Sequence, residues 1–327
     1  MADVTLVAGT LLPDWLPEIA DNITDRNSML SHYKEQDKKK GGRPGYLVTQ
    51  GGREFRETLF TAVNGTFRGY DDREDVDTTV GNPIKEAQYA QKIIAGSLNI
   101  SLLEQAQNTE KYQIHDLLDT KKQEMEYSMA EILGASALSD GTTDTKIPHG
   151  LQLIITASSN NTVGTIDSTA NAFWRPQRDT SGVTAWNTSD EGLIQLDAIY
   201  QNCSRGGEQF EPDLIVTTQA IKSLINVMMI KNHTININDG TEKATLGYGD
   251  VYYRKAKVIA DDNCPAGTLY LVNTRFLRFQ VLKGGNFEMT KMKQPIGGLY
   301  SVAQLYVFCN WTCGARRLQG IMTGITG

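Results

Sequence analysis

The sequence predicts an α+β protein that contains one unusually long helix. A hairpin-like series of strand patterns lies between residues 46 and 82, and a single amphipathic helical pattern runs from residue 110 to residue 138. From residue 150 onward, strand patterns are interrupted by two helical segments and then follow one another to the end of the chain. Together, these three observations indicate the α+β class.

Residues 1 to 45 predict an extended arm. After a short apolar opening and some helical turns between residues 15 and 29, the chain continues as SHYKEQDKKKGGRPG, which is polar and rich in Gly, Pro and Lys. We therefore expect this region to lie outside the core.

The segment from residue 46 to about residue 82 predicts strands joined by turns. Strand-like stretches occur as YLVTQ, REFRETLF and TAVNGTFRGY, separated by Gly-Gly and Asn-Gly pairs and followed by the charged run DDREDVD. Because this segment has too little apolar surface for a core of its own, we expect it to lie against a neighbour.

The region from residue 110 to residue 138 predicts the long helix. Its apolar residues recur at helical spacing with charges between them, at Ile114, Leu117, Leu118, Met125, Met129, Ile132 and Leu133. At about 1.5 Å per residue the helix would be roughly 40 Å long. The cluster Ser139-Asp140-Gly141 is expected to end it.

The remaining residues predict mainly strands. Strands are expected for LQLIIT, DLIVTT, VYYRKAKVIA and TLYLVN, and helices for residues 189–203, with Ser189 as the N-cap, and 219–231. The tail predicts further strands in FLRFQVLK, NFEMTKM, LYSVAQLYVFCNWTCG and RRLQGIMTG.

Composition limits the function classes. The 32 Lys and Arg residues against 38 Asp and Glu give a net charge of −6, so no basic excess favours nucleic-acid binding through phosphate contacts. Four scattered cysteines and an N-terminus without a basic and then apolar leader favour synthesis in a reducing cytoplasm. No apolar run approaches the roughly 18 residues that a membrane span needs.

The common catalytic and cofactor motifs are absent from the sequence. It contains no GxxxxGK[ST] loop, GxGxxG turn, HExxH, GxSxG or paired CxxC site. We therefore predict that the chain is not an enzyme and has no catalytic, cofactor-binding or metal-binding residues.

Isolated histidines and cysteines allow a second interpretation. His115 lies beside acidic residues and could be a metal ligand, but a polar position on the solvated side of the long helix is favoured. His149 is expected to have a loop role. Cys309 and Cys313 would share one face of a strand, as a ligand pair or, preferably, as small buried apolar residues.

Two further features have functional alternatives. Trp174 and Arg175 could form a stacking platform for a base or a sugar, although packing is the favoured role. The acidic run from Asp71 to Asp77 could bind a hard cation but lacks the Gly and the terminal Glu of a calcium loop. We favour a solvated charge patch or one between subunits.

The order of several segments resembles the major capsid proteins of tailed bacteriophages, whose fold is named after phage Hong Kong 97. After the long helix come SDGTTDTKIPHGLQLII, NAFWRPQ with a predicted WRPQ strand, PDLIVTT, ADDNCPAGTLYLVNT and CGARRLQGI, in that order. The resemblance covers essentially residues 45 to 327.

This resemblance implies a division of the chain into parts. They are an N-terminal arm (1–43), an extended E-loop hairpin (44–90), a peripheral domain with the spine helix (91–149), an axial domain (150–274), return strands of the peripheral domain (275–313) and a C-terminal strand of the axial domain (314–327). The chain departs from some relatives because it has no fused scaffolding region and no length for an inserted decoration domain. The Lys and Asn that cross-link some relatives cannot be matched here.

The resemblance also implies the function and the partners. The expected function is the major capsid protein of a tailed double-stranded DNA phage, which assembles in the host cytoplasm into hexameric and pentameric capsomers of the virion. A separate scaffolding protein, a portal protein and a cement or decoration protein are the expected partners, and DNA would be enclosed without sequence-specific binding. The alternatives are an encapsulin-type cargo compartment and a hydrolase or carbohydrate-binding protein.

Shell assembly uses many modest contacts repeated around closed symmetry. Charged residues of the E-loop and the arm are therefore the predicted contacts between subunits, with a solvated charge run as the alternative for each. They are Lys38, Lys39, Lys40, Arg43, Arg53, Glu54, Arg56, Asp71, Asp72, Arg73, Glu74 and Asp75.

Overall fold

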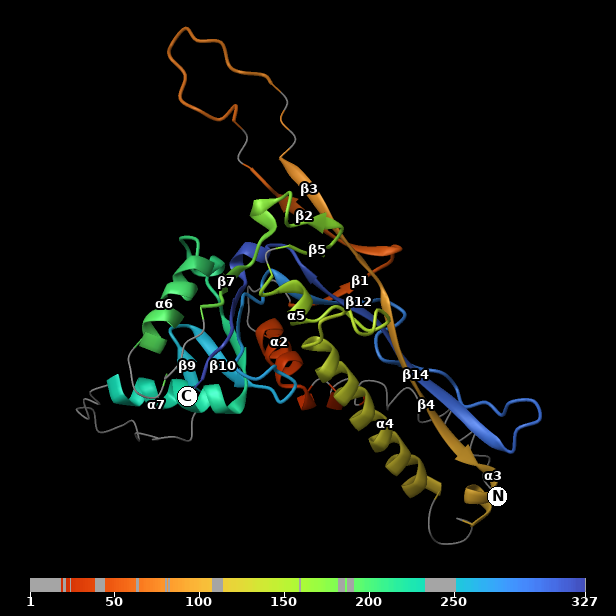
Figure 1. The fold of residues 1–327 in the computed structure, drawn as a ribbon. Coiled ribbons are helices and arrows are strands. Elements are labelled where there is room, and N and C mark those ends of the chain that lie inside the picture. The colour runs from red at the N-terminus through yellow and green to blue at the C-terminus, as the bar shows by residue number, and fades with distance from the viewer. Residues whose placement is uncertain are drawn as a thin grey trace.

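The computed structural model describes residues 19, 22–23, 25–38, 45–62, 65–79, 81, 83–107, 114–158, 160–181, 186, 191–232 and 251–326. Two larger sheets and two hairpins form the β-structure of the described residues, with helices against both of the larger sheets (Figure 1). The helices are α2 (Ser28–Lys38), α3 (Leu102–Gln107), α4 (Ile114–Ala137), α5 (Leu151–Ile154), α6 (Glu191–Cys203) and α7 (Gln219–Asn232). Short 3-10 helices are η1 (Ala172–Trp174), η2 (Glu208–Phe210) and η3 (Arg316–Leu318).

The first sheet is organised by the long strand β14 (Tyr300–Cys313). Residues 300–309 of β14 pair antiparallel with β4 (Lys92–Ser101), and residues 309–313 pair antiparallel with β12 (Leu277–Leu282). The short strands β1 (Tyr46–Thr49) and β13 (Glu288–Met289) extend this sheet through β12 and β14. Helix α4 contacts β4, so the long helix runs beside the two longest strands (Figure 1).

The second sheet has mixed strand directions and separates two apolar cores. Its order is β7 (Gln177–Asp179), β15 (Gly320–Met322), β11 (Leu269–Val272), β8 (Leu214–Thr217), β10 (Ala256–Ala260) and β9 (Val251–Tyr253). Because successive side chains of a strand point to opposite faces, Ile215 joins the smaller core, which includes residues of α6 and α7, while Leu214 and Val216 join the main core.

The hairpin consists of β2 (Glu54–Phe60) and β3 (Ile84–Ala90). Its tip loop joins the two strands, and the described residues 65–79 of this loop project away from the body (Figure 1). A second, small hairpin of β5 (Thr162–Val163) and β6 (Ile166–Asp167) supports it, because Gln88 N donates to Gly164 O at 3.0 Å. Gly164 has φ +61°, and a Cβ at this position would lie 2.9 Å from the Cβ of Ala87. The close approach therefore requires glycine.

The main elements expected from the sequence are confirmed. Helix α4 has Leu118, Met125, Met129 and Leu133 buried, while Ile132 is 46% exposed. Helices α6 and α7 and strands β8, β11, β12 and β14 occupy the predicted segments. The predicted N-cap Ser189 lies outside the described residues. The strand predicted for VYYRKAKVIA is two antiparallel strands, joined by a turn in which Arg254 has φ +51°.

Several predictions were wrong. LQLIIT contains the helix α5 and no strand, because Leu151 and Ile154 both bury against the main core at helical spacing. The described part of TAVNGTFRGY contains no strand. In NAFWRPQ the residues 172–174 form η1, and the strand β7 starts only at Gln177. RRLQGIMTG likewise begins with η3 and becomes a strand only at β15.

The polar stretch after residue 28 is helical and was wrongly predicted to be extended. Asn27 caps α2, since its Oδ1 accepts hydrogen bonds from the backbone N–H groups of Met29 and Leu30, both at 3.0 Å. Met29, Leu30 and Tyr33 are buried, and the Tyr33 hydroxyl donates to Leu277 O at 2.9 Å. This part of the expected arm is therefore built into the core.

Candidate functional site

The base of the hairpin is fixed to the first sheet by a buried carboxylate. Glu57 in β2 accepts hydrogen bonds from Gln280 Nε2 at 2.6 Å, from Thr312 Oγ1 at 3.1 Å and from Arg278 Nη1 at 3.2 Å. Glu57 is only 8% exposed, so these three donors compensate the cost of burying its charge. The alternation of Phe55, Glu57 and Leu59 on one face of β2 is the sequence signal that could have identified it.

The second strand of the hairpin is held by Tyr89. Its hydroxyl donates to Cys313 O at 2.9 Å and accepts from Cys313 N at 3.2 Å, at the end of β14. Burial raises the pKa of Tyr89 well above its usual value. Both strands of the hairpin are thus attached to the same end of β14, which fixes the direction in which the tip loop projects.

The charged residues of the tip loop are exposed and partly paired within the chain. Arg68 Nη2 lies 2.7 Å from Glu74 Oε1, and Arg56 Nη1 in β2 lies 3.6 Å from Glu86 Oε2 in β3. Asp77 Oδ1 accepts a hydrogen bond from Thr79 N at 2.9 Å, whereas the side chains of Asp71, Asp72 and Asp75 have no hydrogen bond or ion pair within the described residues. Their pairing between copies of the chain stays a prediction.

The other predicted contact residues are placed as follows. Arg53 and Arg73 are exposed, and Glu54 is half-buried at the start of β2. Lys38 is the last residue of α2, but its side chain lies outside the described residues, as do Lys39, Lys40 and Arg43. The contact of these basic residues with the tip loop of a neighbouring copy therefore stays a prediction.

Trp174 packs inside the protein, as favoured from the sequence, and Arg175 is half-buried beside it. Trp174 is 1% exposed and its Nε1 donates to Val163 O at 2.9 Å, while Arg175 Nε donates to Ser168 O at 2.8 Å. The buried guanidinium of Arg316 lies over the Trp174 ring, 5.7 Å from its centroid. No face of this ring is left to stack on a ligand.

The environments of His149 and of the four cysteines also indicate structural roles. Burial, with a smaller contribution from Lys92, lowers the pKa of His149 to about 4. All four cysteines are buried and unpaired, and burial raises the pKa of Cys313 to about 12. This confirms the interpretation of Cys309 and Cys313 as small buried residues. The side chain of His115 lies outside the described residues.

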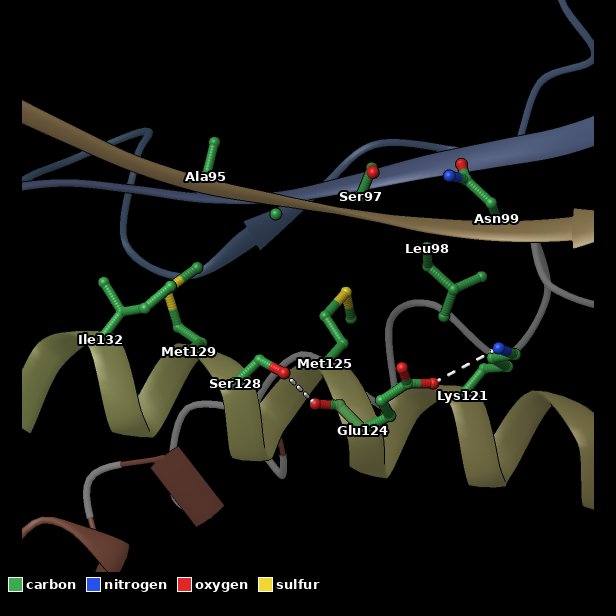
Figure 2. Close-up of a pocket in the computed structure, with 11 residues that line it drawn as sticks. Ala95, Ser97, Leu98, Asn99, Lys121, Glu124, Met125, Ser128, Met129 and Ile132 are labelled. Carbon is green, nitrogen blue, oxygen red and sulfur yellow. Dashed lines mark hydrogen bonds and ion pairs between the residues drawn. The ribbon is translucent and has the colours of Figure 1, made fainter.

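A groove of about 250 Å³ lies between β4 and α4 (Figure 2). Met125 and Met129 point from the helix toward the strand, and Lys121 forms an ion pair with Glu124 at 3.4 Å. Since this acid and this base are paired on the helix surface and no other charged side chain lines the groove within the described residues, it has no arrangement suited to catalysis.

The described residues lack both a metal-binding cluster and a helix that could span a membrane. No group of three or more His, Cys, Asp and Glu side chains could hold a metal ion. None of the helices described has both the length and the apolar character that crossing a membrane requires.

Comparisons with known proteins show similarity in structure only. No family model and no curated protein sequence matches the chain. Among solved structures, a capsid protein of cyanophage A-1(L) matches with a TM-score of 0.62 and 13% identity, over 86% of this chain and 91% of that chain. The capsid protein of phage XM1 matches with a TM-score of 0.54 and 11% identity, over 86% and 90%. The chain has the Hong Kong 97-type capsid fold.

In this fold the hairpin β2–β3 with its tip loop is the E-loop, and α4 is the spine helix. The fold is not limited to phages. The encapsulin of the holo-SrpI complex from Synechococcus elongatus matches with a TM-score of 0.51 and 8% identity, over 88% of this chain and 90% of that chain. The fold alone therefore does not separate a phage capsid from a cellular compartment.

Proposed function

We propose that this chain is the major capsid protein of a tailed double-stranded DNA phage. In this function it forms hexamers and pentamers of an icosahedral head in the host cytoplasm and encloses DNA without reading its sequence. The observation that carries the proposal is the E-loop, a hairpin that projects from the body and exposes Asp71, Asp72 and Asp75 without partners in the described part of the chain. A projecting hairpin of this kind gains its stabilisation from contact with a neighbouring copy of the chain.

The predicted domain boundaries and partners belong to the same proposal. The peripheral domain (91–149 and 275–313) would contain the first sheet and α4, and the axial domain (150–274 and 314–327) would contain the second sheet. A separate scaffolding protein, a portal protein and a cement or decoration protein would complete the head. The contacts between subunits would be many and individually weak, which allows errors to be corrected during assembly.

An encapsulin-type compartment is the second candidate, because an encapsulin matches over nearly the same share of the chain. The higher TM-scores of the two phage capsids favour the phage function. The hydrolase or carbohydrate-binding alternative loses its main support, since Trp174 is buried.

The contents of purified particles distinguish these candidates. The chain is expressed together with its neighbouring genes, and particles are isolated by density-gradient sedimentation and treated with nuclease. A scaffolding protein or nuclease-protected DNA inside the shell supports the capsid function. A single enzyme bound to the inner surface supports the compartment, and a chain that sediments only as a monomer contradicts both.

A further inference from the structure

A groove of about 730 Å³ lies at the base of the E-loop, between β2 and the 3-10 helices η1, η2 and η3. Five arginines from four separate parts of the chain line it, and Glu57 is the only acid among its described lining residues. The arginines are Arg56, Arg205, Arg275, Arg278 and Arg317. We call this feature the arginine groove. The chain as a whole has a net charge of −6, but the fold concentrates positive charge here, where it attracts anions.

Three of these arginines are available to a ligand. Arg278 holds Glu57, so this acid is already neutralised, and Arg56 lies 3.6 Å from Glu86. The side chains of the other three have no hydrogen bond or ion pair within the described residues, namely Arg205, Arg275 and Arg317. Because a guanidinium group binds two oxygens of a phosphate through parallel hydrogen bonds, these side chains provide three positions for phosphate groups.

Aromatic rings line the same groove. Phe60 is 80% exposed, and Phe210 stacks on Phe276 with ring centroids 5.8 Å apart and 16° between the ring planes. A basic groove that carries aromatic side chains is typical of sites that bind unpaired nucleotides, since a flat base stacks on the ring while the phosphates contact the cations. A run of carboxylates would use the arginines but would leave the rings exposed.

We propose that the arginine groove binds nucleotide units, with their phosphates on Arg205, Arg275 and Arg317 and a base stacked on Phe60. Its volume lies within the range of about 300–1,000 Å³ that is usual for sites of small ligands. The unit can come from a free nucleoside triphosphate or from a single strand of nucleic acid, because both carry phosphates and a flat base. Contacts with phosphates and with the face of a base do not depend on sequence.

This inference goes beyond the proposed function and does not depend on which kind of shell the chain forms. It is tested by the binding of a fluorescently labelled strand of about ten thymidines to the purified, nuclease-treated chain, measured by fluorescence anisotropy. The groove variant is R205Q/R275Q/R317Q. Arg56 and Arg278 are left unchanged, because they pair with Glu86 and Glu57.

A matched control removes the same charge elsewhere. The control variant is K283Q/K291Q/K293Q, which changes three exposed lysines that do not line the arginine groove. A third variant, Phe60→Ala, removes the exposed ring and leaves every arginine in place. Circular dichroism and thermal unfolding establish that each variant is folded.

The groove variant should bind the strand about tenfold or more weakly than the wild type. At about 0.7 per phosphate contact of a single strand, the loss of three contacts should lower the slope of log affinity against log salt concentration by about 2. The control variant should keep the affinity and the slope of the wild type. Phe60→Ala should weaken binding about fivefold or more without changing the slope, because it removes stacking and no phosphate contact.

A second titration with fluorescently labelled adenosine triphosphate identifies the source of the nucleotide. Groove-dependent binding of this probe assigns the site to free nucleotides, and binding of the strand alone assigns it to nucleic acid. The inference is overturned if the wild type binds neither probe, if the groove and control variants lose equal affinity, or if polyglutamate displaces the probe as well as an unlabelled strand does. Particle formation by the wild type is recorded separately and bears only on the proposed function.

Discussion

The carboxylate of Glu57 lies 3.2 Å from the guanidinium of Arg278, and this pair connects the E-loop to the first sheet. Gln280 and Thr312 donate to the same carboxylate, so the pair is part of a network that joins β2, β12 and β14. Because the network is buried, it resists rotation of the hairpin about its base. The direction of the projecting E-loop is therefore determined inside the subunit, before any contact between copies forms.

Removal of the Glu57 carboxylate should destabilise the subunit. Glu57→Ala leaves the charge of Arg278 without its partner and should lower the free energy of unfolding by about 2–4 kcal/mol, measured by urea denaturation. Glu86→Ala removes an acid that is paired with Arg56 in the same hairpin but is exposed, and should cost less than about 1 kcal/mol. Equal losses in the two variants contradict a stabilising role for the Glu57 network.

Arg316 should be required for stability, whereas the adjacent Arg317 should not. Arg316 Nε donates to Ile154 O at 2.8 Å and its Nη2 donates to Asn161 Oδ1 at 2.9 Å. Arg316→Ala leaves these acceptors unsatisfied and opens space over Trp174, so we expect a loss of about 3 kcal/mol in unfolding free energy. Arg317→Ala changes an exposed side chain and should stay within about 0.5 kcal/mol. A thermal midpoint that is the same in both variants contradicts this prediction.

His149 should make the subunit less stable in mild acid. Its pKa is lowered from 6.5 to about 4 by burial and by Lys92, so the unfolded chain takes up the proton at higher pH than the folded chain does. Stability is complete above pH 6.5 and decreases as the pH falls toward 4, by roughly 3 kcal/mol over the whole window at about 1.4 kcal/mol per pKa unit. His149→Asn removes this contribution to the pH dependence.

The measurement is the difference in urea midpoint between wild type and His149→Asn from pH 7 to pH 4. Carboxylates titrate in both proteins, so their effect cancels in this difference. A difference that does not change with pH refutes the assignment of the acid sensitivity to His149.

The sequence was sufficient to predict those helices and strands whose apolar residues form a regular pattern over neighbouring positions. The apolar spacing in α4 was sufficient, because one face of a helix can be identified from residues three and four positions apart. LQLIIT in α5 was not distinguishable from a strand, since a short apolar run has no period of its own. Strands β3 and β4 were missed, although Ile94, Leu98 and Ile100 alternate with outward-facing residues in β4.

The functional surfaces were harder to predict. The acidic run at the tip was evident, since its charges are consecutive in the sequence. The groove at the base of the E-loop was not, because its arginines Arg56, Arg205, Arg275 and Arg317 are brought together only by the fold. The same reason applies to Glu57, whose partner Arg278 lies 221 residues away in the sequence. A contact between such distant residues has no local sequence signal.

Electron microscopy of the purified wild-type chain, alone and co-expressed with its neighbouring gene products, tests the central claim most directly. We predict closed icosahedral shells built from rings of six and five subunits, with E-loops that reach from each subunit to the next. A homogeneous population of single subunits under all of these conditions would contradict the claim that the chain is a shell protein.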